Sequence, residues 1–206
     1  MAKRSTSQNW LQRQRKDPYV KQAQNSHYRS RAVYKLQEID QKDSLIKPNY
    51  CVVDLGSAPG SWSQYASERI GPKGRVIAVD ILAMEPIEQV LTILGDFTDE
   101  AVEKECLGHI GKQGADLVIS DMAPNLTGIR TTDQARSMAL AELVHDFCHK
   151  ALKPGGNLLI KVFEGAGTNE YRQLLKEHFA KVMTRKPGAS RDNSREFYVL
   201  ARSYRL

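Results

Sequence analysis

Short apolar segments alternate with helical patterns along most of this 206-residue chain. The apolar segments are nearly continuous runs of Val, Ile and Leu, a pattern typical of strands buried on both faces of a parallel sheet. We expect such strands at 50–55, 75–80, 90–94, 115–121 and 157–163. Helical patterns cover 31–41, 61–70, 99–110, 132–152 and 169–179. This alternation predicts an α/β domain in which right-handed crossovers place helices on both faces of the sheet.

The end of the chain departs from the alternation. Segments 181–185 and 196–202 both have strand patterns, and Pro187-Gly188 lies between them where a helix would otherwise be expected. Two consecutive strands without a crossover pair antiparallel, so we expect a hairpin at one edge of a mostly parallel sheet. Earlier in the chain, Pro154-Gly155-Gly156 is expected to end the long helix before the fifth strand.

Charged residues stand where several of these strands end. Ligands of such sheets bind beyond the carboxyl ends of the strands, near the point where the strand order reverses. The charged residues at or near these ends are Asp54, Asp80, Asp96, Asp121 and Lys161. They mark this edge of the sheet as the expected site.

The first strand runs into a loop that contains two glycines, Asp54-Leu-Gly56-Ser-Ala-Pro-Gly60. Glycine permits a tight turn and lets the backbone approach a ligand closely. The spacing Gly-x-x-x-Gly differs from the Gly-x-Gly-x-x-Gly of dinucleotide sites. Asp80 is placed to accept from ribose hydroxyls, and Asp96 from an exocyclic adenine amine. Asp54 is placed to interact with an amino group of the ligand.

Several carboxylates around a nucleoside pocket favour a cationic ligand and would repel a pyrophosphate. S-adenosyl-L-methionine carries a sulfonium and an ammonium group and therefore fits this set of charges. A dinucleotide, or a loop with a purely structural role, remains an alternative on these residues alone.

The N-terminal segment is strongly basic within a chain of net charge +6 and pI of about 9.2. Up to residue 35 its only acidic residue is Asp17, and aromatic residues are interleaved with the cations. Cations with aromatics suit RNA, whose phosphates supply affinity and whose unpaired bases stack. A solvated basic tail, or a surface for acidic proteins or membranes, is the alternative. The candidate RNA contacts are Arg13, Arg15, Lys16, Lys21, Arg29 and Arg31. We expect a basic arm over 1–29 and a single domain over 30–206.

Other features limit the class of protein. No apolar run reaches the ~18 residues that a membrane span needs, and the polar N-terminus does not resemble a signal peptide. The three cysteines are too scattered for a disulfide framework or a zinc site. We therefore expect a cytoplasmic protein with no membrane partner. His145 and His149 have a metal-compatible spacing, but without a metalloprotease motif we expect a packing or surface role and no metal.

Motifs spread over almost the whole chain resemble those of the FtsJ/RrmJ (RlmE) family of ribose 2′-O-methyltransferases. The matching motifs are Asp17-Pro-Tyr-Val-Lys21, Ser30-Arg-Ala, Asp54-Leu-Gly-Ser-Ala-Pro-Gly-Ser-Trp62, Gly95-Asp-Phe97, Ser120-Asp-Met-Ala-Pro-Asn125, Gly165 and Ser194-Arg-Glu-Phe-Tyr198. Two serines depart from the family pattern, because Ser57 and Ser61 stand where alanine and glycine are expected.

The resemblance implies a Rossmann-like methyltransferase fold with a seven-stranded sheet and S-adenosyl-L-methionine as methyl donor. It implies a catalytic tetrad of Lys35, Asp121, Lys161 and Glu196. The expected cofactor-binding residues are Asp54, Gly56, Ser57, Pro59, Gly60, Trp62, Asp80, Asp96, Phe97 and Asp121. The bacterial branch of the family implies a uridine ribose in the A loop of 23S rRNA as the acceptor, on the assembled large ribosomal subunit.

The chemistry of ribose methylation gives the tetrad its roles. A 2′-hydroxyl is a poor nucleophile, so its proton must be removed or its developing alkoxide stabilised. We favour Lys161 as the base, with Asp121 orienting it and Lys35 and Glu196 positioning the groups that react. As a base Lys161 must be neutral, which burial or the nearby cation of Lys35 would favour. Lys161 could instead stabilise the alkoxide as a cation.

Three other functions remain open on the sequence: a tRNA ribose 2′-O-methyltransferase, a non-catalytic RNA-binding factor in ribosome assembly, and an NAD-dependent oxidoreductase. Whichever of these functions holds, we expect the protein to be a monomer.

Overall fold

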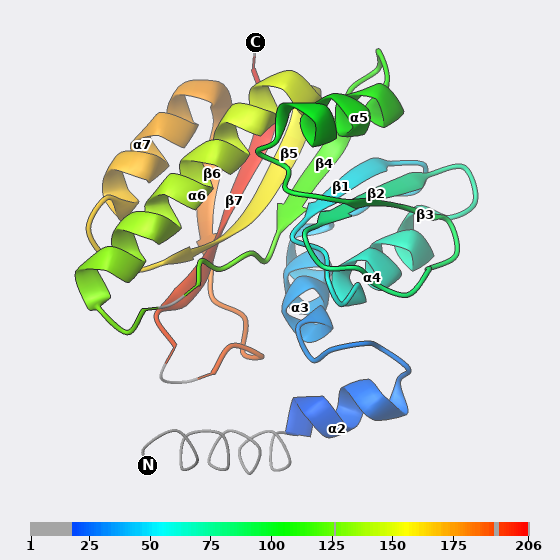
Figure 1. Ribbon diagram of the computed structural model, residues 1–206, viewed down its shortest axis with the longest axis horizontal. Coiled ribbons are helices and arrows are strands. Elements are labelled where there is room, and N and C mark those ends of the chain that lie inside the picture. The colour runs from blue at the N-terminus through cyan, green and yellow to red at the C-terminus, as the bar shows by residue number, and fades with distance from the viewer. Residues whose placement is uncertain (1–17, 126, 192–193, 206) are drawn as a thin grey trace.

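The computed structural model describes residues 18–125, 127–191 and 194–205. Within these residues, seven strands form one sheet in the order β3-β2-β1-β4-β5-β7-β6 (Figure 1). Their bounds are β1 Cys51–Leu55, β2 Arg75–Asp80, β3 Val90–Leu94, β4 Ala115–Ser120, β5 Leu152–Phe163, β6 Phe179–Arg185 and β7 Glu196–Tyr204. The first five strands are parallel, and β7 runs antiparallel to both β5 and β6. The predicted mostly parallel sheet with an antiparallel edge hairpin is confirmed.

Helices cover both faces of the sheet (Figure 1). They are α2 Pro18–Asn25, α3 Val33–Asp43, α4 Ser61–Ile70, α5 Glu100–Ile110, α6 Arg130–Ala151 and α7 Thr168–His178. Alternate residues of β1 point to opposite faces, as the two-residue period of a strand requires. Val53 lies in one apolar core with residues of α5, α6 and α7, whereas Val52 lies in a second core with residues of α2, α3 and α4.

Strand β5 begins earlier than the sequence pattern predicts. The long helix α6 ends at Ala151, and Leu152 already pairs with Ala115 of β4. The prediction that Pro154-Gly155-Gly156 forms a break before the strand is therefore wrong. The pairing of β4 and β5 shifts register between Ala115 and Leu117, and this irregularity accommodates the Pro-Gly-Gly segment inside the strand.

Hydrogen bonds fix α3, which carries Lys35, onto its neighbours. The Asp40 carboxylate accepts hydrogen bonds from the hydroxyl of Tyr65 on α4 at 2.8 Å and from the amide of Ile46 at 2.7 Å. At the end of the helix, the Arg185 guanidinium donates to both oxygens of Asp43 at 2.6 and 2.7 Å. The helix is thus held between α4 and β6, which fixes the position of Lys35.

The sequence did not predict a helix within the basic arm. Helix α2 packs on the domain, with Ala23 buried in the second core and the rings of Tyr19 and Tyr34 centred 5.5 Å apart. The described second half of the arm is therefore joined to the domain by apolar contacts. In the described part of the chain, no helix is both long and apolar enough to span a membrane.

Candidate active site

A cavity of about 680 Å³ opens at the carboxyl ends of the parallel strands. Its volume lies in the range of small-molecule binding sites, ~300–1,000 Å³. Four loops and one helix form its wall. The lining residues are Gly56 and Ala58 after β1, Asp80 to Leu82 after β2, Gly95 to Thr98 after β3, Asp121 to Asn125 after β4, and Arg136, Ala139, Leu140 and Leu143 of α6. Five of the predicted cofactor-binding residues therefore meet here: Gly56, Asp80, Asp96, Phe97 and Asp121.

The glycine loop has a backbone shape that depends on Gly56. This residue has a φ of +74°, in the left-handed region. A Cβ built on it would lie 1.9 Å from Cγ of Met122, in the loop after β4. The missing side chain therefore lets two loops of the cavity wall come together. Gly60, where α4 begins, and Pro59 complete the turn.

Asp80 holds the glycine loop in place, a role that the sequence did not reveal. One of its carboxylate oxygens accepts a hydrogen bond from the amide of Ala58 at 2.8 Å, and the other accepts one from Leu82 at 2.8 Å. These bonds orient the carboxylate at the cavity wall. A carboxylate has further lone pairs, so the predicted acceptance from ribose hydroxyls remains compatible with this geometry.

Asp96 and Phe97 line the cavity from the loop after β3, which neighbours Asp80. Oδ1 of Asp96 accepts hydrogen bonds from the amide and hydroxyl of Thr98 at 2.9 and 2.8 Å, which fix the carboxylate. Phe97 is largely buried and packs edge-on against Phe147 of α6, with ring centroids 6.4 Å apart. Together they provide an acceptor next to an apolar ring, which suits an adenine base.

Asp54 lies beneath the glycine loop. It lines a smaller cavity of about 60 Å³ with Ser57, Pro59, Trp62 and Asp121. It is 1% exposed, and the Ser63 hydroxyl donates to it at 2.6 Å. Burial raises the pKa of Asp54 to about 7; the hydrogen bond from Ser63 opposes this shift, and the charges of Asp121 and Asp80 add to it. A ligand ammonium group near this carboxylate would favour its ionised form.

Trp62 connects α4 to the start of α3. Its indole N–H donates to the carbonyl of Ala32 at 2.8 Å, and its ring lies 5.8 Å from that of Tyr198. It therefore positions the elements that carry Lys35 as well as lining the smaller cavity.

The four predicted catalytic residues form two ion pairs. Nζ of Lys161 lies 3.1 Å from Oδ1 of Asp121, and Nζ of Lys35 lies 2.7 Å from Oε1 of Glu196. The four side chains are between 9% and 19% exposed. They come from α3, the end of β4, β5 and the start of β7, so only the folded sheet brings them together.

The two ion pairs also interact with each other. Lys161 also donates a hydrogen bond to the backbone carbonyl of Asp121. Burial raises the pKa of Glu196, but the charge and the hydrogen bond of Lys35 lower it by more than burial raises it. The charge of Lys161 adds to this lowering, so the pKa of Glu196 lies below its ordinary value. Glu196 is therefore ionised at neutral pH. The cluster thus places the amino group of Lys161 next to the nucleoside-sized cavity, with the Lys35–Glu196 ion pair behind it.

Tyr198 is a member of the site that the sequence did not identify. It is fully buried, and its hydroxyl donates to Oδ1 of Asp121 at 2.6 Å, the oxygen that also faces Lys161. Its ring centroid lies 5.8 Å from Nζ of Lys35. The available signal was the spacing of Glu196 and Tyr198, because residues two apart in a strand share a face.

Replacing Tyr198 with phenylalanine is expected to lower kcat about tenfold, because Asp121 would lose a charge-assisted hydrogen bond that orients it toward Lys161. The KM for the methyl donor should change little. Steady-state methyl transfer and thermal unfolding measure the two effects. Tyr171→Phe is the matched control, since it removes a buried tyrosine hydrogen bond to the carbonyl of Ala141, in the core on the other face of the sheet from Tyr198. Equal kcat values in the two variants would contradict the positioning role of Tyr198.

The predicted RNA contacts fall into three groups. Arg13, Arg15 and Lys16 lie outside the described residues. Lys21 is exposed on α2. Arg29 donates to the carbonyls of Pro59, Glu85 and Pro86, and Arg31 donates to the carbonyl of Ala189. These two arginines therefore brace loops of the domain, a structural use that charge alone does not indicate.

The cavity fits a cationic nucleoside. It combines fixed carboxylates with a buried aromatic ring and closely packed loops, and it lies beside the Lys161–Asp121 pair. This set of residues suits S-adenosyl-L-methionine, which would place its sulfonium methyl group near the tetrad. A pyrophosphate would meet the negative charges of Asp80 and Asp96.

The chain is similar to several known methyltransferases. Residues 28–204 match the model of the FtsJ-like methyltransferase family. The Ribosomal RNA large subunit methyltransferase E of Pseudomonas paraeruginosa is 54% identical over 205 residues, covering 100% of this chain and 99% of the relative.

A solved ribosomal RNA methyltransferase from Plasmodium falciparum is 31% identical with a TM-score of 0.79, covering 86% of this chain and 98% of the solved chain. Fibrillarin from Aeropyrum pernix, solved with bound S-adenosyl-L-methionine, shares the fold at 17% identity and a TM-score of 0.59, covering 84% of this chain and 75% of its own. The chain belongs to the FtsJ-like methyltransferase family, and its donor is S-adenosyl-L-methionine.

Proposed function

We propose that this protein methylates the 2′-hydroxyl of a uridine ribose in 23S rRNA, in the A loop of the assembled large ribosomal subunit. The observation that carries the proposal is the pairing of Lys161 with Asp121 and of Lys35 with Glu196 beside a nucleoside-sized cavity. The name and full-length similarity of the Pseudomonas relative support rRNA as the acceptor.

In this proposal Lys161 deprotonates the nucleophile. The 2′-hydroxyl lies next to Nζ of Lys161 and loses its proton to that nitrogen as the new O–C bond forms. Asp121 orients the amino group through its ion pair with Lys161, and Tyr198 orients Asp121. When bound, S-adenosyl-L-methionine would supply the methyl group from its sulfonium, with the neutral thioether as the leaving group. Alignment of the oxygen, carbon and sulfur contributes much of the rate enhancement.

Lys35 and Glu196 form the wall of the acceptor site. Their ion pair is largely buried, so each side chain has a fixed position against Tyr198. We infer that Glu196 accepts a hydrogen bond from a hydroxyl of the acceptor nucleoside or from Lys161. Lys35 keeps Glu196 ionised, because its charge and hydrogen bond lower the pKa of that carboxyl.

The basic arm would bind the acceptor RNA. Arg13, Arg15, Lys16 and Lys21 supply cations in the N-terminal part of the sequence. Arg29 and Arg31 follow them and contact the glycine loop and the loop after β6. We further propose that the protein acts in the cytoplasm as a monomer, where assembled large subunits are its substrate.

The choice of acceptor is tested by methyl transfer from labelled S-adenosyl-L-methionine. We expect efficient labelling of 50S particles that lack the modification and much weaker labelling of free 23S rRNA and free tRNA. Particles that already carry the modification serve as the control. Labelling of tRNA in preference to 50S particles would contradict the proposed substrate. RNA binding without any methyl transfer would instead indicate an assembly factor.

A further inference from the structure

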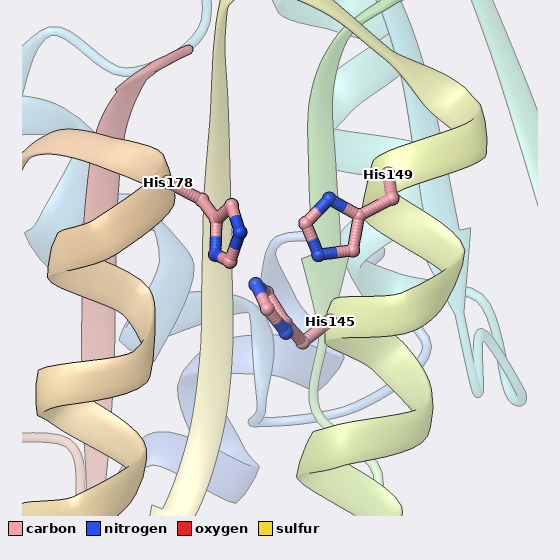
Figure 2. A group of neighbouring side chains, drawn as sticks. All are labelled: His145, His149 and His178. Atoms are coloured by element: carbon pink, nitrogen blue, oxygen red, sulfur yellow. The ribbon is translucent and has the colours of Figure 1, made fainter. Parts of the chain in front are cut away.

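Three histidines lie together between α6 and α7, on residues that the reaction does not use (Figure 2). His145 and His149 stand one helical turn apart on α6, and His178 is the last residue of α7. One ring nitrogen from each lies within 4.8 Å of the other two. The ring centroids are 4.4, 4.5 and 5.1 Å apart, and Figure 2 shows the three rings turned toward a shared space.

The hydrogen bonds around the cluster engage Nδ1 of two of these rings. Nδ1 of His149 lies 2.7 Å from the Tyr204 hydroxyl. Nδ1 of His178 lies 3.3 Å from the carbonyl oxygen of Leu174 and must donate the hydrogen, because a carbonyl only accepts. An imidazole that donates through Nδ1 keeps a lone pair on Nε2, the usual arrangement of a metal-binding histidine.

His145 contributes the strongest single observation. The residue is 2% exposed, and its buried Nε2 has no hydrogen-bond partner among the residues that the structure describes. A buried polar atom without a partner is costly, and such atoms often mark a missing ligand.

We propose that His145, His149 and His178 bind one divalent ion of the Zn²⁺ type. Neutral imidazole is a borderline ligand that suits Zn²⁺, Cu²⁺ and Ni²⁺, whereas Mg²⁺ and Ca²⁺ require oxygen ligands. Because His149 is exposed, water can occupy a fourth position. Tetrahedral Zn²⁺ with Zn–N bonds of ~2.0–2.1 Å requires its nitrogens to lie about 3.4 Å apart. The ring nitrogens lie within 4.8 Å of one another, and rotation of the exposed His149 and half-buried His178 side chains can bring them to the shorter spacing.

The site lies away from the methyl-transfer centre. Helix α6 lines the donor cavity at Arg136, Ala139, Leu140 and Leu143, and His149 follows Leu143 by about 9 Å along the helix, at a rise of ~1.5 Å per residue. The bound ion would link the end of α6 to the end of α7 and, through Tyr204, to β7. It is therefore a structural clamp, and the methyl-transfer reaction does not require it.

The test measures Zn²⁺ binding to untagged full-length protein by isothermal titration calorimetry and equilibrium dialysis. We expect one Zn²⁺ per chain, a rise in Tm on binding, and no comparable effect of Mg²⁺. Co²⁺ in place of Zn²⁺ should give the visible absorption of a four-coordinate nitrogen site. His149→Ala and His178→Ala should abolish stoichiometric binding, and Tyr204→Phe should weaken it about 10- to 100-fold by removing the partner of a ligand.

His109→Ala is the matched control, because it removes an exposed helix histidine outside the cluster and should leave binding unchanged. His149 and His178 are not core residues, so their variants are expected to fold, which circular dichroism and Tm without metal check. Unchanged Zn²⁺ affinity in both variants, or no stoichiometric binding to the unmodified protein at micromolar Zn²⁺, would overturn the proposal.

Discussion

Lys161→Ala is expected to lower kcat for methyl transfer by about 100- to 10,000-fold, the range typical of losing a general base. The variant should bind S-adenosyl-L-methionine with nearly unchanged affinity, because the carboxylates and the aromatic ring of the cavity remain. Single-turnover methylation of 50S particles measures the first quantity, and calorimetric titration of the donor measures the second.

Lys153→Ala is the matched control for this prediction. Lys153 lies on the same strand, β5, and forms an ion pair with Asp116 at 2.5 Å, near the opposite end of the sheet. The control should keep nearly full activity. Undiminished methyl transfer by Lys161→Ala would refute the role of Lys161, and equal losses in the two variants would indicate a general effect on the fold.

Lys161→Arg separates the two roles that the lysine could have. Arginine keeps a positive charge, but it cannot act as a base at physiological pH because it stays protonated. If Lys161 removes the proton, Lys161→Arg should be nearly as inactive as Lys161→Ala. Substantial activity in the arginine variant would instead favour stabilisation of the alkoxide by a cation.

Gly56→Ala is expected to weaken S-adenosyl-L-methionine binding at least about tenfold and to reduce turnover at low donor concentration. The new Cβ would meet Met122, and the backbone would be strained at its positive φ, at a cost of roughly 1–2 kcal/mol. Both effects displace the loops that form the cavity wall. Calorimetric titration of the donor and chemical denaturation measure them.

Gly71→Ala separates the two effects. Gly71 has a similar φ of +70°, but a Cβ there meets no atom within 4 Å. It should cost considerable backbone strain, because its ψ of −176° lies in a region that is essentially restricted to glycine, while leaving donor binding intact. If Gly56→Ala bound the donor as tightly as Gly71→Ala, the cavity beside Gly56 would not be the donor site.

Much of the fold follows from local patterns along the chain. The runs at 75–80 and 90–94 became β2 and β3 with unchanged bounds. In β2 the apolar run reflects burial on both faces, whereas β3 is an edge strand on which Leu91 and Leu94 are exposed. The positions of Asp80, Asp96 and Asp121 followed from the same logic, since residues at the carboxyl ends of parallel strands share one edge of the sheet. The antiparallel hairpin followed from two strand patterns with no helix between them.

The remaining features depend on contacts between distant segments. Tyr198 and Asp121 are 77 residues apart, and only the pairing of β5 with β7 brings Tyr198 opposite Lys161. His178 joins His145 and His149 only because α7 packs against α6, so the pair on one helix could not reveal the third ligand. The charge of Arg29 led to its prediction as an RNA contact. In the structure, hydrogen bonds to three carbonyls of neighbouring loops set its position.

The most direct test of the central claim is to locate the transferred methyl group. Particles lacking the modification would be incubated with labelled S-adenosyl-L-methionine, and their 23S rRNA hydrolysed in alkali. A 2′-O-methyl group blocks cleavage of the adjacent phosphodiester, so the account predicts label in one alkali-resistant dinucleotide from the A loop, and none with Lys161→Ala. Label that appears only in mononucleotides would place the methyl group on a base and contradict the account.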